Sequence, residues 1–599
     1  MSENQNATGK INIVDQRKAF EQKRQLEQAE RQKAIDERDP FYGLQVDPEV
    51  EYYEEISHRE PGDTNWVGYG FDLHPQVALG SGILLIIFVA WILILGDQAS
   101  ALFNTILSSI STNFDWLYIG AANVILVVML YFAFSNYGKI RLGGPEAKPE
   151  FSNFAWYSML LSAGIGIGLM FWSVAEPIFH FSNPSPMFGF EPGTPEAAQA
   201  AFAVTYFHWG IHGWAIYGLV GLGLAFYAYN RGLPLTIRSA FYPLLGDRIY
   251  GFWGNVIDIL SVLATFAGLA TSLGFGVQQV SAGLNFLFGI PATTIVQVIL
   301  IGIITLFATM SVIAGLDGGV KVLSEWNMRI AGLLLLFVLI VGPTTYILRS
   351  FVQNLGFYFQ ILPQLSFWTE VYHPGSNWQE GWTIFYWGWW ISWSPFVGVF
   401  VARVSKGRTI KEFILGLMIL PSLLCFLWMS VFGGTAIYFE QSGANVSRAV
   451  NENVATALFE MFQNLPLTGL LSLVGIILTV IFFVTSSDSG SLVVDNLTSG
   501  GKLDSPVPQR VFWAIMEGVL AGTLLLGGGL GALQTASITT GVPFTIVLLI
   551  MMYGLNIVFR EEVYHLDAHE VTEVIKRTPI STDVLEGVED FEGGLAAAD

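Results

Sequence analysis

Residues 164–168 read Gly-Ile-Gly-Ile-Gly in the middle of an apolar stretch that runs from residue 153 to 181. Three glycines at alternate positions weaken a helix by about 1 kcal/mol each relative to alanine. The run is compatible with tight helix packing, because small residues let two backbones approach in lipid. It is equally compatible with a helix that is interrupted at a binding site in the middle of a membrane. The rest of the chain decides between these two interpretations.

The stretch around this run is one of twelve that are long and apolar enough to cross a bilayer, which takes about 20 residues. Of the 599 residues, 52% are apolar and only 13% are charged, against about 25% charged in a soluble domain. This composition excludes an ordinary soluble enzyme, and the single cysteine excludes an intramolecular disulfide. The predicted spans are residues 76–97, 115–137, 153–181, 198–229, 250–279, 290–314, 328–351, 382–404, 411–438, 466–487, 510–531 and 537–559.

The eighth span, residues 382–404, is also irregular. It contains Gly388 and Pro395, and it has four tryptophans within residues 387–393. Spans three and eight are five apart, so an inverted repeat of five plus five helices would place two interrupted helices at corresponding positions. The predicted fold is therefore an all-α integral membrane protein with twelve transmembrane helices, of which the first two are peripheral. The predicted repeats are residues 152–351 and 382–559.

The positive charges predict the orientation of the spans. With the N-terminus inside, the loops on the cytoplasmic side hold fourteen Lys and Arg residues, whereas the opposite side holds only Arg349 and Arg448. Lys and Arg collect on the cytoplasmic side of membrane proteins, so both termini are expected in the cytoplasm, as tails of residues 1–75 and 560–599. Residues 1–77 carry a net charge of −7 and residues 560–599 one of −8, so a nucleic-acid partner is not expected.

Aromatic side chains gather on two of the spans. On one continuous helix, Trp209, Trp214 and Tyr217 would fall within about 140° of one another. The negative faces of converging rings attract a cation that cannot donate hydrogen bonds, such as a methylated ammonium. Any single tryptophan is more easily explained by packing, but seven or eight large rings on two helices favour a cation-binding cage.

Few polar side chains inside the spans suggest other chemistry. His208 and His212 have the spacing of a zinc pair, but no third ligand accompanies them, so a structural or proton-sensitive role is preferred. The acids in or near spans are Asp258, Asp488 and Glu176. Asp488 lies in a run of hydroxyls, residues 485–491, that is suited to binding Na⁺ or to hydrogen bonding between helices. No catalytic motif is found, so neither an enzyme nor a cofactor is expected.

These residues together resemble the betaine/carnitine/choline transporter family, from about residue 80 to 560. The resemblance implies the inverted-repeat fold of sodium-coupled amine symporters, and usually a homotrimer. The motifs that carry it are Gly164 to Trp172 followed by Ala175-Glu176-Pro177; His208-Trp209-Gly210-Ile211-His212 with Trp214 and Tyr217; Gly315 to Lys321; Trp387 to Pro395; and Thr485-Ser486 with Asp488-Ser489.

The resemblance assigns the substrate site residue by residue. The aromatic box of the family corresponds to Trp209, Trp214, Tyr217 and Trp390, and Trp389 would flank the substrate. Three further rings, at Trp387, Trp393 and Phe396, match the outgoing path, and Trp393 is also predicted to bind the substrate.

The same resemblance assigns two sodium sites. The main site would use backbone carbonyls of Ser162 and Ile165 and the hydroxyls of Thr485 and Ser486. A second site would use Thr265 and Phe396. One of the hydroxyl positions of this second site holds Leu269, with Thr271 two residues further on, so the second ion is less well supported.

The resemblance implies a secondary transporter in a bacterial cytoplasmic membrane, in contact with lipid, that imports a quaternary ammonium or sulfonium compound. Spans five and ten contain no Lys or Arg, which favours Na⁺ symport. Choline-type members tend to carry an acid in the glycine run, and Gly168 ends this run without one, which favours a zwitterion such as glycine betaine. The alternative is a sodium-independent or proton-coupled transporter of choline, carnitine or dimethylsulfoniopropionate. A channel would need a polar pore, which these spans do not show.

Overall fold

The computed structural model describes residues 61–164, 166–314 and 321–577. Residues 61–558 belong to one compact unit, and residues 559–577 belong to another. Two of the motifs named above lie partly or wholly outside the described residues, since Ile165 and residues 315–320 are not among them.

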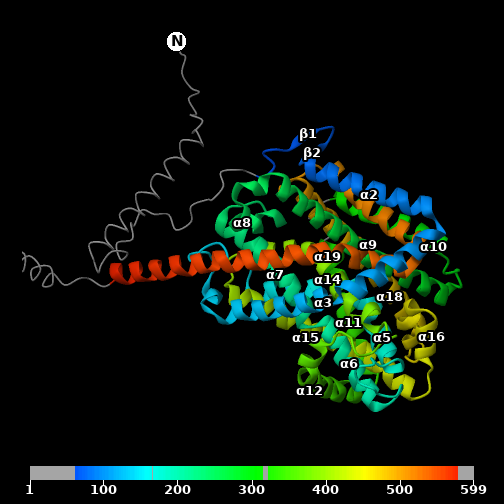
Figure 1. Cartoon of the computed structure of the whole chain (residues 1–599). Helices are drawn as coiled ribbons and strands as arrows, with labels where there is room; N and C mark the ends of the chain where they lie inside the picture. Colours follow the sequence, from blue (N-terminus) through cyan, green and yellow to red (C-terminus); the bar gives the residue numbers. More distant parts are fainter. Residues whose placement is uncertain (1–60, 165, 315–320, 578–599) are drawn as a thin grey trace, which may run out of the picture. The chain divides into compact units, whose positions relative to one another are not determined.

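A short β-hairpin precedes the first long helix, and the other regular elements that the structure describes are helices, in agreement with the predicted all-α membrane protein (Figure 1). Strand β1 (Trp66–Gly68) pairs with β2 (Phe71–Leu73) in antiparallel register. Tyr69 and Gly70, the two residues of the turn, both have positive φ, which is the geometry that matches the twist of a two-residue hairpin. The hairpin is held by Asp72, whose carboxylate pairs with Lys502 Nζ at 2.5 Å.

Helices make up nearly all of the remaining described chain. The longer ones are α2 (Pro75–Leu95), α3 (Asp97–Phe134), α4 (Asn153–Gly164), α5 (Ile167–Ser182), α6 (Pro195–Trp209), α7 (Ile211–Arg231), α9 (Phe252–Phe288), α10 (Thr294–Ala314), α11 (Lys321–Val341), α12 (Thr344–Phe367), α14 (Thr383–Val404), α15 (Ile410–Gln441), α18 (Thr468–Thr498) and α19 (Val507–Arg577). The short ones are α8 (Tyr242–Leu245), α13 (Trp378–Gly381), α16 (Val446–Glu452) and α17 (Ala457–Phe462).

Within the described residues, nine helical segments are long and apolar enough to span a membrane. The predicted span 153–181 is not among them because it is divided into α4 and α5. The span 382–404 is α14, whose Trp, Ser and Gly residues lower its mean hydropathy. The spans 510–531 and 537–559 fall on one segment, α19, which is kinked at Gly528 and Gly529.

The boundaries of some predicted spans are wrong. Residues 328–351 do not form one helix, because α11 ends at Val341 and α12 begins at Thr344 after Gly342 and Pro343. Proline lacks the amide hydrogen that would continue the hydrogen-bond ladder, and it disfavours the helical conformation of the residue before it.

The glycine run interrupts its helix, as one of the two interpretations required. Helix α4 ends at Gly164, Gly166 is extended with φ −161° and ψ −169°, and α5 begins at Ile167. By contrast, α14 is continuous through Gly388 and Pro395, so the prediction of a second interrupted helix is wrong. Pro395 leaves the carbonyl of Ile391 without its helical donor, and the Ser394 hydroxyl donates to that carbonyl at 2.7 Å instead.

A break that the sequence analysis missed lies between α6 and α7. Gly210 has φ −101° and ψ −148° and separates the two helices. A Cβ at this position would lie 2.4 Å from the Tyr206 carbonyl oxygen and 2.8 Å from the Phe426 ring, so only glycine fits without a shift of the neighbours. The predicted span 198–229 is therefore two helices, and one helical wheel cannot describe how the side chains of both are oriented.

Helix α14 lies at the centre of the unit formed by residues 61–558. It packs most extensively on α7, and it also packs on α9, whose other main partner is α18 (Figure 1). Glycines allow both close approaches. A Cβ on Gly398 of α14 would lie 2.5 Å from Val220 of α7, and a Cβ on Gly268 of α9 would lie 3.0 Å from the Trp393 amide nitrogen. This packing brings the tryptophans of α14 against the aromatic residues of α6 and α7.

Candidate functional site

Five of the six predicted substrate-site rings lie in one aromatic cluster. Trp390 of α14 is its centre, with ring centroids 5.0 Å from Trp209 at 76° and 5.9 Å from Tyr217 at 71°. Trp214 lies edge-on to Tyr217 at 5.4 Å. Trp389 stacks on Trp390 at 4.7 Å and 19°. We call these five residues the cage. All five are at most 7% exposed, so a cation among them would be largely removed from water.

The three cage residues of α6 and α7 do not share one helical face, since Gly210 separates Trp209 from the other two. Trp209 and Tyr217 meet because each packs against the same ring of α14, Trp390, and Trp214 joins them through Tyr217. Glycine makes room for that ring, because a Cβ on Gly213 would lie 3.0 Å from Trp390 Cδ1 and Nε1. The expectation that these rings converge holds, although the helical wheel behind it does not apply.

The interrupted helix reaches the same place. A Cβ on Gly168, in the first turn of α5, would lie 2.4 Å from Cη2 of Trp389 and 3.2 Å from Cη2 of Trp209. The last glycine of the run therefore packs directly against the cage. The N-terminus of a helix presents free backbone N–H groups and a positive dipole end, which together bind anionic groups. The site thus combines negative ring faces with a nearby helix end suited to an anion.

Hydrogen bonds fix the orientation of two cage rings. Trp390 Nε1 donates to the backbone carbonyl of His208 at 2.8 Å. Trp209 Nε1 donates to Glu176 Oε2 at 2.8 Å, and the Tyr386 hydroxyl donates to the same oxygen. Glu176 is 0% exposed. A buried carboxylate therefore touches the cage through the indole of Trp209, which the sequence analysis did not foresee.

The two histidines of the predicted i, i+4 pair have different partners. His208 bonds Glu176 Oε1 through Nδ1 at 2.6 Å and Thr383 Oγ1 through Nε2 at 3.0 Å. His212 Nε2 lies 3.1 Å from Asn123 Oδ1. These contacts agree with the structural role that was preferred over a zinc pair.

A different group, Glu176, His180 and His208, has its ligand atoms within 4.8 Å of one another and is fully buried. His180 Nε2 lies 3.6 Å from Glu176 Oε1. A metal ion there would have to break the bond between His208 and Glu176. Because Glu176 already accepts from three side chains, the group is better explained as a hydrogen-bonded support for the cage.

The sixth predicted substrate-site residue is placed apart from the cage. Trp393 is half-buried, and its ring packs on Phe396 at 4.8 Å. Trp387 is buried between α14 and α6, with Phe207 at 5.1 Å and His212 at 5.7 Å. Trp393 shares a face of α14 with Trp389 but lies one helical turn further along the helix axis, where its ring meets Phe396 instead of the cage.

The predicted main sodium site is described only in part. Ile165 lies outside the described residues, and Ser162 belongs to the last turn of α4. Thr485 Oγ1 bonds the carbonyl oxygen of Ile481 at 3.0 Å, one turn earlier in α18. Thr485 and Ser486 are both half-buried.

The second predicted sodium site lacks one hydroxyl. Thr265 is buried and bonds the Ser261 carbonyl oxygen at 2.7 Å. Leu269 occupies the position where the second sodium site would need its other hydroxyl. Its side chain packs against α18, because a Cβ on Gly490 would lie 2.5 Å from Leu269 Cδ2. Thr271 does not compensate, because its hydroxyl is within 2.8 Å of the Leu533 carbonyl oxygen and Ser537 Oγ on α19.

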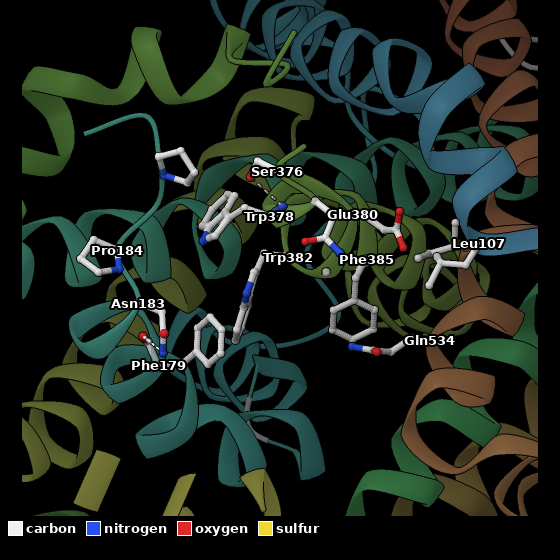
Figure 2. A pocket seen from close by; sticks show the side chains of 14 residues that line it. Leu107, Phe179, Asn183, Pro184, Ser376, Trp378, Glu380, Trp382, Phe385 and Gln534 are labelled. Carbon is white, nitrogen blue, oxygen red and sulfur yellow. Dashed lines mark hydrogen bonds between the residues drawn. The ribbon is translucent and has the colours of Figure 1, made fainter. Parts of the chain in front are cut away.

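A cavity of about 410 Å³ lies beside the cage, between the end of α5 and the start of α14. Figure 2 shows the rings of Trp378, Trp382 and Phe385 and the carboxylate of Glu380 along its wall. Phe385 stacks on Trp389 of the cage at 5.5 Å. The ring of Phe385 therefore lies between this cavity and the cage.

Comparison with known proteins assigns the family. A family model described as the betaine/carnitine/choline family transporter matches residues 76–564. The chain belongs to this family. It is therefore a transporter and not an enzyme, and it is a multi-pass membrane protein.

Two similar proteins come from Vibrio parahaemolyticus. The chain is 47% identical over 501 residues to a glycine betaine/proline/choline transporter, with 81% of this chain and 90% of the relative covered. It is 46% identical over 510 residues to glycine betaine transporter 1, with 82% and 95% covered. It is also 45% identical over 486 residues to a glycine betaine transporter of Acinetobacter baylyi, with 81% and 73% covered.

Proposed function

We propose that this member of the betaine/carnitine/choline family imports a methylated onium zwitterion, glycine betaine or a similar compatible solute, by Na⁺ symport. The observation that carries the proposal is the edge-on packing of Trp209 and Tyr217 against Trp390, beside the N-terminus of α5 at Gly168. The cage suits the trimethylammonium end, which makes no hydrogen bonds. The helix end suits the carboxylate.

The names of the relatives support this substrate class, since those of the three proteins described above include glycine betaine. Choline is a second candidate, and Glu176 is the observation that favours it. Choline carries an unbalanced positive charge, which is costly in a site of low dielectric constant unless an acid is near. The glycine run itself contains no acid. Glu176, however, lies about two turns further along the same span, and its carboxylate accepts a hydrogen bond from Trp209 of the cage.

Na⁺ coupling is supported by the break in the helix after Gly164, where backbone carbonyls lose their helical donors, and by the half-buried hydroxyls of Thr485 and Ser486 on α18. We place the main ion there. The second ion, at Thr265 and Phe396, is the weaker proposal because Leu269 occupies a ligand position.

The arrangement in the membrane is also a proposal. We infer twelve crossings, with α4 and α5 together as one, α14 as another and α19 as two, in a bacterial cytoplasmic membrane with both termini inside. The fourteen-to-two distribution of Lys and Arg supports this orientation. We retain two peripheral helices, the repeats 152–351 and 382–559, and a homotrimer.

Uptake into proteoliposomes tests the function. Radiolabelled glycine betaine, choline, carnitine and dimethylsulfoniopropionate are offered with an inward Na⁺ gradient, with an inward proton gradient in Na⁺-free buffer, and with neither. We expect accumulation of betaine only with Na⁺. Full uptake without Na⁺ would instead support the exchanger or the proton-coupled transporter.

A further inference from the structure

One buried amide joins the interrupted helix to the helix that carries the hydroxyls of the proposed main sodium site. Gln279 of α9 is 1% exposed. Its Nε2 donates to the backbone carbonyl oxygen of Met170, in the first turn of α5, at 3.1 Å. Its Oε1 accepts from the hydroxyl of Thr479, on α18, at 3.0 Å. A single side chain therefore bridges α5 and α18, and neither the cage nor the two sodium sites include it.

The chemistry of the two partners fixes the orientation of this amide. A carbonyl oxygen only accepts hydrogen bonds, so the NH₂ group of Gln279 must face Met170 and the amide oxygen must face Thr479. The Thr479 hydroxyl also lies 2.8 Å from the Gly475 carbonyl oxygen, so its one hydrogen is shared between α18 and the amide. Separation of α5 from α18 would leave a buried amide without a partner, which is costly because water does not replace the lost bond.

Helix α9 supports the bridge from behind. It packs on both α5 and α18, and more extensively on each of them than they pack on one another. Glycines of α9 allow both close contacts. A Cβ on Gly276 would lie 3.1 Å from Ile167, the first residue of α5, and one on Gly283 would lie 2.6 Å from Ile476 of α18. Gln279 lies about one helical turn from each glycine, so it fastens α5 to α18 where α9 approaches both.

The bridge lies close to the elements of the proposed main sodium site. Thr479 precedes Thr485 by six residues, which is about 9 Å along α18. Met170 belongs to the first turn after the break at Gly166. An ion bound by carbonyls at this break and by hydroxyls of α18 needs both helices at one spacing, and the bridge sets that spacing.

We propose that Gln279 is a positioning residue for Na⁺ symport, which holds the first turn of α5 at the distance from α18 at which one ion contacts both helices. The inference rests on the proposed function. Gly168, in the same turn of α5, packs against the cage. The bridge therefore also links the bound ion to the helix end that would bind the carboxylate of the substrate.

Gln279→Met tests the role, because it removes both hydrogen bonds but keeps an unbranched side chain of similar length. Without the bridge, only a fraction of the molecules hold α5 and α18 at the binding distance, and the apparent Na⁺ affinity falls by that fraction. We expect the Na⁺ concentration for half-maximal betaine uptake into proteoliposomes to rise roughly five- to tenfold. The KM for betaine at saturating Na⁺ should change by less than about twofold, since the bound ion then holds the two helices.

Two further variants make the test specific. Thr479→Val removes one of the two bonds and should give a smaller rise of the same kind, which also keeps the inference testable if Gln279→Met does not fold. Ser261→Ala is the matched control, because it removes a buried hydroxyl of α9 that bonds the Ile257 carbonyl oxygen of its own helix. Its Na⁺ dependence should equal that of wild type.

The outcomes separate this inference from the proposed function. If wild-type uptake depends on Na⁺ and both bridge variants keep the wild-type half-maximal Na⁺ concentration, the inference is overturned and the proposed function stands. The inference also fails if the variants lower only the unfolding temperature in KCl, since Gln279 would then have a purely structural role. Na⁺-independent uptake by wild type would overturn the proposed coupling, and the role of Gln279 with it.

Discussion

At the scale of single residues, the cage depends on which ring each side chain meets. Trp390 contacts rings from two different helices and donates its N–H to the His208 carbonyl oxygen. Trp214 meets the group only through Tyr217. The two tryptophans are therefore unequal members of the same cage.

Loss of the central ring should weaken transport more than loss of the peripheral one. Cation–π contacts in a desolvated site contribute about 2 kcal/mol or more, which is over a factor of ten in affinity. We expect Trp390→Leu to raise the KM for betaine by at least about tenfold, and Trp214→Leu to raise it by less. Uptake kinetics in proteoliposomes measure both. Trp253→Leu is the control, because this ring is 59% exposed. Equal small changes of KM in all three variants would show that the cage does not bind the substrate.

Glu176 should set the preference between choline and betaine. Its carboxylate accepts the Trp209 indole N–H at 2.8 Å, and a charge about 8 Å away at an effective dielectric constant near 20 interacts by roughly 2 kcal/mol. Glu176→Gln keeps an acceptor for the ring but removes the charge. We expect the choline-to-betaine uptake ratio to fall by about thirtyfold, since the carboxylate of betaine already balances its own ammonium group.

Competition of unlabelled choline against labelled betaine measures that ratio directly. If wild type does not carry choline at all, or if the ratio is unchanged in Glu176→Gln, the charge of Glu176 plays no part in selectivity. Gly168→Asp, which would test the same charge argument from the glycine run, is a poorer variant, because even its Cβ would lie 2.4 Å from Trp389 and would displace a cage ring.

At the scale of helices, α18 carries two hydroxyls that are not buried in packing. Thr485→Ala combined with Ser486→Ala should raise the Na⁺ concentration for half-maximal betaine uptake, because an ion bound by oxygens loses two of them. The KM for betaine at saturating Na⁺ should change much less. Thr498→Ala is a matched control, since its hydroxyl lies in the same helix, is buried and bonds the Val494 carbonyl oxygen. An unchanged Na⁺ dependence of uptake in the double variant would show that Thr485 and Ser486 are not ligands of the coupling ion.

The start of α2 contains a pH-sensitive residue. Burial, and then the positive charge of Arg238, lower the pKa of His74 from 6.5 to about 4. The folded state therefore holds His74 neutral, while an unfolded chain binds a proton below about pH 6.5. Its contribution to stability is complete above pH 6.5 and is lost as the pH falls toward 4, by an amount on the order of 2–3 kcal/mol.

We expect His74→Gln to lose less stability than wild type over that range. Thermal unfolding of both proteins in detergent from pH 8 to pH 4 gives the difference. Parallel curves would mean that His74 is protonated in the folded protein as well. Comparison with the variant isolates His74 from the other buried histidines, such as His180.

At the scale of the whole molecule, the orientation of the spans can be read with single cysteines. The one native cysteine, Cys425, is 1% exposed, so wild type is its own unlabelled control. Lys148 and Tyr372 are both exposed, the latter at 90%. The charge distribution predicts that a membrane-impermeant maleimide labels Tyr372→Cys from outside intact cells, and labels Lys148→Cys only in inverted vesicles. Labelling of both from the same side would contradict the proposed number of crossings between them.

The sequence by itself determined what depends on composition and on residues close together in the chain. Hydropathy identified nearly every long helix, and the alternating glycines identified the interruption between α4 and α5, because backbone preference is local. Quoting the motifs was enough to recognise the family, and with it five of the rings that meet in the cage. Gly210 carried a signal of its own between two helical segments, but one glycine is too common to predict a break.

The tertiary structure decided which of these residues meet and what orients them. Glu176 and Tyr386 are 210 residues apart, so no local pattern pairs them. Trp393 has the same composition around it as Trp390, yet the continuous α14 turns it toward Phe396 and away from the cage. Helix α14 continues through Pro395, and the Ser394 hydroxyl donates to the Ile391 carbonyl that the proline leaves without its helical donor. Partners of buried polar groups are set by packing between helices distant in the chain, and packing follows from shape and volume that a one-dimensional pattern does not record.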